Sequence, residues 1–188
     1  MQRRDDLDRF FDYGIHVPTR QLFMGTETDD EMAELFLKGM AMLSTSHQPI
    51  TVIMNNMGGD EYDGLAIYDA IATCPSHVTV IAYGHAMSMG SWILQAADER
   101  VMSPHATMML HYGTWGDCDH VPVVRKLMAE GERLNQLMER TYLERIKQAD
   151  PKYTLRALRK ILETDTYLTA QQAVEMGLAD KILGGGGN

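Results

Sequence analysis

The sequence predicts one layered α/β domain whose strands form a largely parallel sheet. Stretches rich in β-branched and apolar residues alternate with stretches of helical periodicity. Two strand–loop–helix units, residues 49–72 and 77–97, follow one another directly, and right-handed crossovers of this kind build parallel sheets. The length of 188 residues suffices for one core but not for two ordinary domains. We therefore expect a single domain over residues 1–183 and a flexible glycine-rich tail over residues 184–188.

A helix over residues 28–43 is predicted before the first strand–loop–helix unit. Thr28 would cap it, with Glu31 three residues on as in a capping box. Residues 49–55 read as a strand that ends in the loop 56–59, Asn-Met-Gly-Gly, and a helix follows over residues 62–72.

The second predicted unit is the strand 77–83, a turn at Gly84 and a helix over residues 88–97. Residues 107–111 form a further short strand. After the long helix described next, we expect shorter helices over residues 154–162 and 170–176 and a final strand over residues 180–183.

The longest predicted helix covers residues 122–148. Pro122 suits its first turn, and apolar residues recur at spacings of three and four, including Leu134 and Met138. Such a helix would be about 40 Å long, whereas a chain of this length has an expected radius of gyration of about 16 Å. Part of the helix should project from the domain, and self-association would supply a partner for its apolar stripe.

Composition and charge exclude several classes of protein. A net charge of −9 argues against nucleic acid or an anionic membrane as the main partner. No stretch approaches the roughly 20 apolar residues of a membrane-spanning helix, and no secretory signal is visible. Cys74 and Cys118 match no metal or redox spacing, so we expect two free thiols and a cytoplasmic location.

Ser88 is the first candidate for a chemical role. It stands where the helix after a buried strand begins, in residues 86–90, Ala-Met-Ser-Met-Gly. A turn at this place exposes the hydroxyl, and the unpaired amides of the helix stabilise a negative charge that develops on a bound carbonyl. The segment resembles a nucleophile elbow with Ala86 in place of the usual glycine. A serine at a helix start is more often only a cap.

The loop 56–60 is the second candidate because it also lies at the carboxyl end of a strand. Loops at this edge of a parallel sheet build the site, so this loop and Ser88 should be neighbours. Paired glycines let a backbone amide approach a ligand closely, although a simple turn has the same pattern.

A serine nucleophile needs a base and a group that orients the base. His111 ends an apolar run and should reach the same sheet edge, while His85, three residues before Ser88, is the competing base. For the acid, spacing alone barely separates Asp165 from three other aspartates, which are Asp117, Asp119 and Asp150. Residues 117–120, Asp-Cys-Asp-His, are a weak rival as a metal site because adjacent residues rarely converge on one ion. We expect no metal.

With these residues assembled, the sequence resembles the ClpP family of ATP-dependent serine proteases over about residues 10–183. Residues 86–90 match the family's nucleophile motif, and residues 107–111 match the run that ends in the catalytic histidine. Residues 163–170 and 173–180 match the segment that carries the catalytic aspartate, and this match selects Asp165. Gly58 and Gly59 match the oxyanion loop.

The resemblance implies a ClpP/crotonase-like fold of repeated β-β-α and βαβ units in which Ser88, His111 and Asp165 form a catalytic triad. The amides of Gly59 and Met89 would be the oxyanion donors. The projecting helix would be the family's handle, which intercalates between two stacked seven-membered rings, and an AAA+ ATPase would be the partner. No cofactor is implied.

Several positions depart from the family pattern. Residues 56–57, Asn-Met, replace the usual serine-proline, and Thr164 replaces an arginine that couples the rings. The loop after His111 lacks the usual proline and glycine-rich strand. The segment before Phe10 is short for an axial loop, and Ile53 replaces an aromatic residue associated with ATPase docking. These departures concern the partner ATPase and the assembly of the rings, not the peptidase chemistry.

The resulting prediction is a serine endopeptidase that cleaves polypeptides through an acyl-enzyme within a homo-oligomeric ring. Two alternatives stay open. An acyl-CoA hydratase or isomerase of the crotonase type would use Asp60 or Glu61 as its catalytic carboxylate and would not need Ser88. A non-catalytic ring subunit would have no chemical reason to keep the three triad residues.

Overall fold

The computed structural model describes residues 10–114, 116 and 120–185. Its strands are β1 (Ile15–His16), β2 (Gln21–Met24), β3 (Ile50–Asn56), β4 (Val78–Met87), β5 (Glu99–Met102), β6 (Thr107–Leu110), β7 (Thr166–Thr169) and β8 (Lys181–Ile182). Its helices are the 3₁₀ turn η1 (Val17–Thr19), α2 (Asp30–Leu43), α3 (Glu61–Ala72), α4 (Met89–Leu94), α5 (Val121–Ala149), α6 (Leu155–Leu162) and α7 (Ala170–Glu175).

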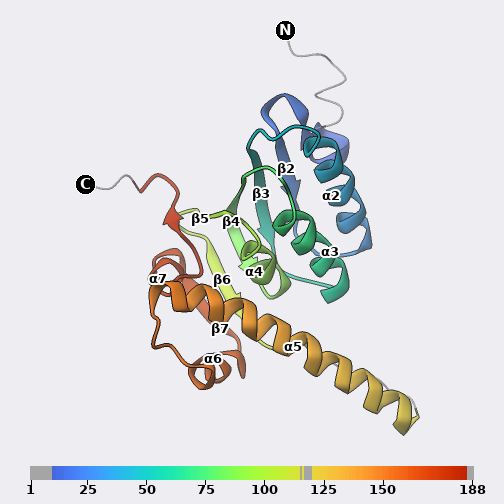
Figure 1. Cartoon of the computed structure of the whole chain (residues 1–188), viewed down its shortest axis with the longest axis vertical. Coiled ribbons are helices and arrows are strands. Elements are labelled where there is room, and N and C mark those ends of the chain that lie inside the picture. The colour runs from blue at the N-terminus through green and yellow to red at the C-terminus, as the bar shows by residue number, and fades with distance from the viewer. Residues whose placement is uncertain (1–9, 115, 117–119, 186–188) are drawn as a thin grey trace.

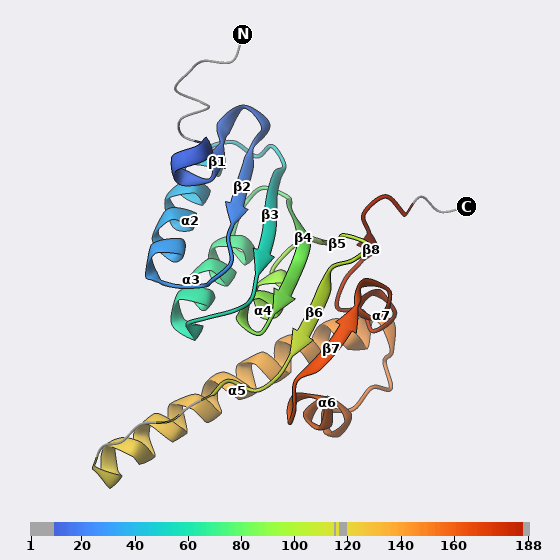
Figure 2. The same ribbon diagram turned by 180° about the vertical axis from the view of Figure 1, so that it is seen from behind.

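In the described residues the strands form one mixed sheet with the main order β1-β2-β3-β4-β5-β8. The central strands β2 to β5 run parallel, as the tandem strand–loop–helix units predict. Figures 1 and 2 show α2, α3 and α4 on one face of this sheet. Alternate residues of β3 are buried, and the core lies between the sheet and these helices.

Strand β4 is longer than the sequence suggests. The predicted turn at Gly84 is wrong: the register against β3 shifts there, and the strand resumes and continues to Met87. Gly84 adopts φ 59°, and the backbone N–H of the next residue, His85, donates to the Asn55 side chain. The irregularity is therefore a bulge and not a chain reversal. Beyond the bulge β4 pairs with β6, which carries the sheet edge toward the candidate site.

The long helix is confirmed as α5, with 29 residues and Pro122 in its first turn. Figures 1 and 2 show its first half extending away from the rest of the fold. Val123 and Met128 in this half are 45% and 51% exposed. By contrast, Leu134 and Met138 are buried by the domain itself, so our expectation that they face another subunit is wrong.

The starts of α2 and α3 are each fixed by an aspartate cap. Asp29, not Thr28, caps α2 through a hydrogen bond from Met32 N–H. Asp60 caps α3, which begins at Glu61. Thr28 is instead buried and lies against the loop 56–60, as the next subsection describes.

Four strands were not predicted: β1, β2, β5 and β7. Each has two to four residues. β1 pairs with the nearby β2, whereas β5 and β7 gain their backbone partners from distant segments. The sequence predicts only a link between two helices at residues 165–169, yet β7 forms there and pairs antiparallel with β6. This pairing places the third triad candidate.

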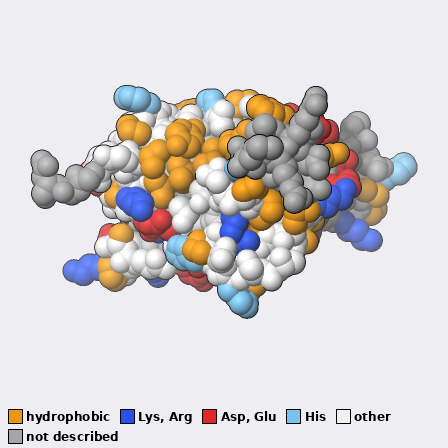
Figure 3. Space-filling view, turned by 90° about the horizontal axis from the view of Figure 1, so that it is seen from above, with side chains coloured by type: hydrophobic (Ala, Val, Ile, Leu, Met, Phe, Trp, Pro, Cys, Tyr) orange, Lys and Arg blue, Asp and Glu red, His pale blue; other side chains and the backbone are white. Residues whose placement is uncertain are grey.

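Exposed apolar side chains gather at the end of the molecule that carries the N-terminus (Figure 3). Phe11, Tyr13 and Phe23 are 78%, 56% and 39% exposed, and Phe10 packs edge-on against both phenylalanines. Among the described residues, no helix combines the length and apolar character needed to cross a membrane.

Candidate active site

Ser88 follows the last residue of β4 directly and precedes the first residue of α4. Its backbone has φ 49° and ψ −124°, a conformation that costs a non-glycine residue about 1–3 kcal/mol. Its amide donates to Met109 O at 2.9 Å, so β6 holds the turn in place. This strand–turn–helix geometry aims the hydroxyl out of the sheet edge, as a nucleophile elbow requires.

His111 and Asp165 meet through the antiparallel pairing of β6 with β7. Leu110 pairs with Thr166, so the next residue of β6 and the preceding residue of β7 lie beside each other. The residue directly after β6 is therefore the candidate base, and the residue directly before the unpredicted strand β7 is the candidate acid.

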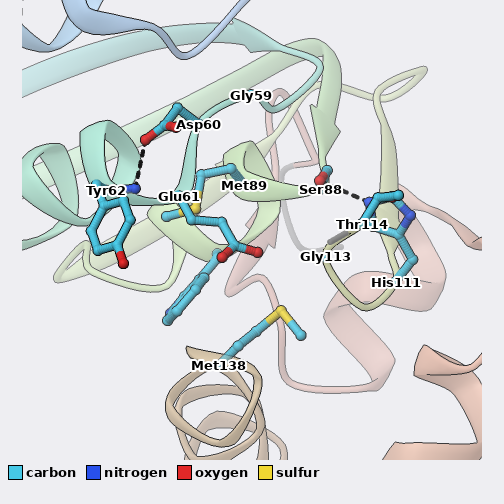
Figure 4. Close-up of a pocket in the computed structure, with 11 residues that line it drawn as sticks. Gly59, Asp60, Glu61, Tyr62, Ser88, Met89, His111, Gly113, Thr114 and Met138 are labelled. Atoms are coloured by element: carbon cyan, nitrogen blue, oxygen red, sulfur yellow. Dashed lines mark hydrogen bonds between the residues drawn. The ribbon is translucent and has the colours of Figure 1, made fainter. Parts of the chain in front are cut away.

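The three side chains form a continuous hydrogen-bonded chain. The Ser88 hydroxyl lies 2.8 Å from His111 Nε2, and His111 Nδ1 lies 3.1 Å from Asp165 Oδ1 (Figure 4 shows the Ser88–His111 contact). The geometry corresponds to the tautomer in which Nδ1–H donates to the carboxylate and Nε2 accepts from the serine. The His111 side chain is 25% exposed and that of Asp165 is 55% exposed, so the acid is open to solvent.

The loop 56–60 lies against Ser88, as predicted. A Cβ added at Gly58 would come within 2.6 Å of Ser88 Cβ, and Gly58 has φ 105°. At Gly59, with φ 147°, an added Cβ would lie 2.0 Å from Thr28 O. Both positions therefore require glycine, because a side chain would clash with Ser88 at Gly58 and with the Thr28 backbone at Gly59.

A buried polar network fixes the same loop. Asn56 is fully buried; its Oδ1 accepts from Gly58 N–H at 2.9 Å and from the Thr28 hydroxyl at 3.1 Å, and its amide donates to Gly25 O. Thr28 N–H also donates to Gly58 O, and Asp60 N–H donates to Thr28 O. The departure at Asn56 thus has a structural role that the sequence did not reveal, with Thr28 as its partner.

The amides of Gly59 and Met89 stay available to a ligand. In the part of the chain that the structure describes, neither donates to a protein acceptor. Met89 is the first residue of α4, where helix amides lack internal partners. The two predicted oxyanion donors therefore come from segments that touch at Gly58 and Ser88.

Two of the competing candidates, His85 and Asp150, do not take part in this chain of contacts. His85 lies within β4, not in the turn where we expected it. Asp150 caps the C-terminus of α5 and accepts from Lys152 N–H. Asp117 and Asp119 lie outside the described residues, as does most of the Asp-Cys-Asp-His stretch considered as a metal site.

A cavity of about 370 Å³ opens beside Ser88 and His111. Glu61, Trp92 and Met138 also line this cavity. Of these three, the sequence suggests a site role only for Glu61, as a carboxylate of the hydratase alternative. They come from three separate helices, and their periodicity marks Trp92 and Met138 only as core residues. Asp60 does not reach into the cavity as a base would, since its carboxylate accepts from Tyr62 N–H and Asp63 N–H at the start of α3.

A second group of side chains, also missed, supports the residue after the base. Tyr112 donates its hydroxyl to Glu139 on α5, and Arg159 on α6 donates to the same carboxylate through two nitrogens, each at 2.9 Å. Burial alone would raise the pKa of Glu139, but the hydrogen bonds from Arg159 and Tyr112 outweigh it and hold the pKa below its ordinary value of 4.5. Glu139 thereby ties the segment after β6 to two helices.

Comparison with known proteins places this geometry in a family. A family model described as Clp protease matches residues 8–185. The ATP-dependent Clp protease proteolytic subunit of Chlorella vulgaris is 33% identical over 167 residues, covering 87% of this chain and 81% of that protein. The corresponding subunit of Deinococcus radiodurans is 29% identical over 181 residues, covering 94% and 86%.

A solved structure agrees. A ClpP1 variant from Listeria monocytogenes superimposes with a TM-score of 0.77 at 25% identity, and the match covers 89% of this chain and 92% of that one. The mixed sheet with its flanking helices is therefore the crotonase-like fold of ClpP, as predicted. Neither comparison favours a crotonase-type hydratase or isomerase. Because the family model spans nearly the whole chain, the protein belongs to the Clp protease family and is a serine endopeptidase.

Proposed function

We propose that Ser88, His111 and Asp165 are the catalytic triad of this peptidase. The observation that carries the proposal is the unbroken hydrogen-bonded chain from the Ser88 hydroxyl through His111 to Asp165. Three residues from distant segments have no packing reason to form this chain. A non-catalytic ring subunit would not need it.

The geometry supports an acyl-enzyme mechanism. His111 Nε2 takes the proton of Ser88 as Oγ attacks the peptide carbonyl, and the amides of Gly59 and Met89 donate to the oxyanion. His111 then gives the proton to the leaving amine, and Asp165 holds the imidazole through Nδ1–H. Water, deprotonated by His111, releases the acyl group. No step requires a cofactor.

The test is intact-mass analysis after exposure to a fluorophosphonate. We expect one adduct per chain at Ser88, none in Ser88→Ala, and slower labelling in His111→Ala and Asp165→Ala because the nucleophile then lacks its base or the base its orienting group. Labelling that persists in Ser88→Ala would contradict the assignment.

We further propose that the chain assembles into two stacked seven-membered rings and that an AAA+ ATPase delivers polypeptides to the enclosed sites. The relatives' names describe ATP-dependent proteolytic subunits, and the projecting half of α5 exposes apolar residues. An ATPase would dock on the exposed aromatic side chains near the N-terminus, which include Phe11, Tyr13 and Phe23. This site fits because Phe23 on β2 pairs in register with Ile53 on β3. An exposed aromatic thus lies beside the position where the family's aromatic is replaced.

The cytoplasmic location stays a prediction.

A folded, tagged substrate tests the enclosed chamber. Short peptides should be cut without ATP, whereas the folded protein should survive unless an ATPase and ATP are added. Because Ile53 replaces the family's aromatic residue, we expect weak stimulation by a Clp ATPase of another origin. Degradation of the folded protein by the peptidase alone would contradict the chamber.

A further inference from the structure

The cavity beside Ser88 has a carboxylate on an otherwise apolar far wall. Met89, Trp92 and Met138, which line it, are 3%, 2% and 6% exposed. Glu61, the first residue of α3, is half-buried, and Figure 4 shows its carboxylate reaching into the space between Met89 and Met138. A wall of this kind suits a side chain with an apolar stem and a polar end.

The triad fixes which part of a substrate enters this space. His111 must protonate the leaving amine, so the leaving group lies on the His111 side of Ser88. The acyl half of the substrate then lies on the other side of the serine, where Figure 4 places Glu61 and Met138. The side chain next to the scissile carbonyl, the acyl-side residue, therefore points toward Glu61.

Charge around the cavity is negative. Among the described lining residues there is no lysine or arginine, and the acidic ones are Asp60 and Glu61. Partial burial, and after it the negative charges of Asp60, Asp30 and Asp29, raise the pKa of Asp63.

We propose that Glu61 makes this peptidase selective for lysine or arginine as the acyl-side residue. The methylenes of such a side chain would pack on Trp92, Met89 and Met138, and its charged end would contact the Glu61 carboxylate. An acidic residue in the same place would meet a like charge in a partly desolvated space. The inference rests on the proposed function, because it uses Ser88 and His111 to orient the substrate.

The test uses short peptides that release aminomethylcoumarin and differ only in the acyl-side residue: lysine, arginine, norleucine or glutamate. Norleucine matches the lysine stem without the ammonium group. For the natural protein we expect kcat/KM for lysine to exceed that for norleucine by about tenfold or more, the size of one charge-assisted contact. Glutamate should be the poorest of the four.

Two variants and one control assign the effect to Glu61. Glu61→Gln should lower the lysine-to-norleucine ratio by about tenfold, and Glu61→Lys should favour glutamate over lysine. Asp63→Asn removes a nearby negative charge that does not line the cavity, and it should keep the ratio of the natural protein.

Fluorophosphonate labelling of each protein separates the two hypotheses. Suppose that Ser88 is labelled but the natural protein cuts the norleucine peptide as well as the lysine peptide. The proposed selectivity is then overturned, while the catalytic triad is still supported. A ratio that survives in Glu61→Gln would likewise overturn the role of Glu61. If Ser88 of the natural protein is not labelled, the proposed function fails and this inference with it.

Discussion

Tyr142 on the long helix α5 shares a hydrogen bond with Ser91 on α4, with 2.7 Å between the two hydroxyl oxygens. Ser91 donates its own proton to Ser88 O at 2.7 Å, so Tyr142 is the donor of the pair. Burial raises the pKa of Tyr142, which keeps the phenol protonated. The helix that projects from the fold is thus linked, through one serine, to the backbone of the nucleophile.

Removing this link should loosen the turn at Ser88. Tyr142→Phe leaves the Ser91 oxygen without its buried donor, and we expect a loss of about 1–2 kcal/mol in the free energy of unfolding by urea, with slower fluorophosphonate labelling. Tyr153→Phe is the control, because within the described residues its hydroxyl makes no hydrogen bond to protein. Equal stability of the two variants would show that the hydrogen bond between Tyr142 and Ser91 does not stabilise the fold.

Glu139→Gln should destabilise the protein in a pH-dependent way. The folded pKa of Glu139 lies below its ordinary value of 4.5, so the carboxylate stabilises the fold fully above about pH 4.5, and this contribution is lost as the pH falls through the folded pKa. We expect the variant to lose about 1–3 kcal/mol at pH 7, with the difference from the natural protein shrinking below pH 4.5.

Urea unfolding at several pH values measures this difference. Glu132→Gln is the matched control on the same helix, since Glu132 is exposed and its carboxylate accepts a hydrogen bond from Gln136 rather than from Arg159 or Tyr112. It should change stability by less than about 0.5 kcal/mol. A Glu139→Gln difference that grew on acidification would contradict the assigned direction of the pKa.

Gly58→Ala should slow fluorophosphonate labelling of Ser88 by more than its loss of global stability explains. The left-handed backbone and the clash of the new Cβ with Ser88 Cβ cost about 1 kcal/mol or more, and the strain acts on the nucleophile itself. Gly116→Ala, where an added Cβ meets nothing within 4 Å, is the control. Thermal unfolding and the rate of Ser88 labelling check both variants, and unchanged labelling in Gly58→Ala would refute the close approach.

Assembly should depend on the projecting half of α5. Val123→Glu with Met128→Glu places charge on exposed apolar positions, so we expect smaller species in sedimentation velocity and unchanged helical content by circular dichroism. Lys126→Ala on the same exposed segment should not alter the assembly. Leu134 and Met138 are unsuitable for this test because their burial within the chain would make the substitutions unfold it.

The sequence was sufficient to predict the parallel α/β architecture, the long helix and the sheet edge that carries Ser88 and the loop 56–60. These features follow from local patterns: periodicity fixes the type of an element, and a parallel sheet brings the carboxyl ends of its strands together. Local residues also identified His111 as a candidate base. Asp165 was selected only by family resemblance, because nothing in its own spacing separates it from other aspartates.

Tertiary structure decided the rest, because the deciding contacts join segments far apart in the chain. The pairing of Leu110 with Thr166 brings Asp165 to His111, and the short strand β7 has no sequence signal of its own strong enough to predict it. Thr28 looks like a helix cap, yet it holds the oxyanion loop, since a buried Asn56 competes for its hydroxyl. The cavity beside Ser88 exists only where three helices meet, so the place of Glu61 in it could be read from the fold alone.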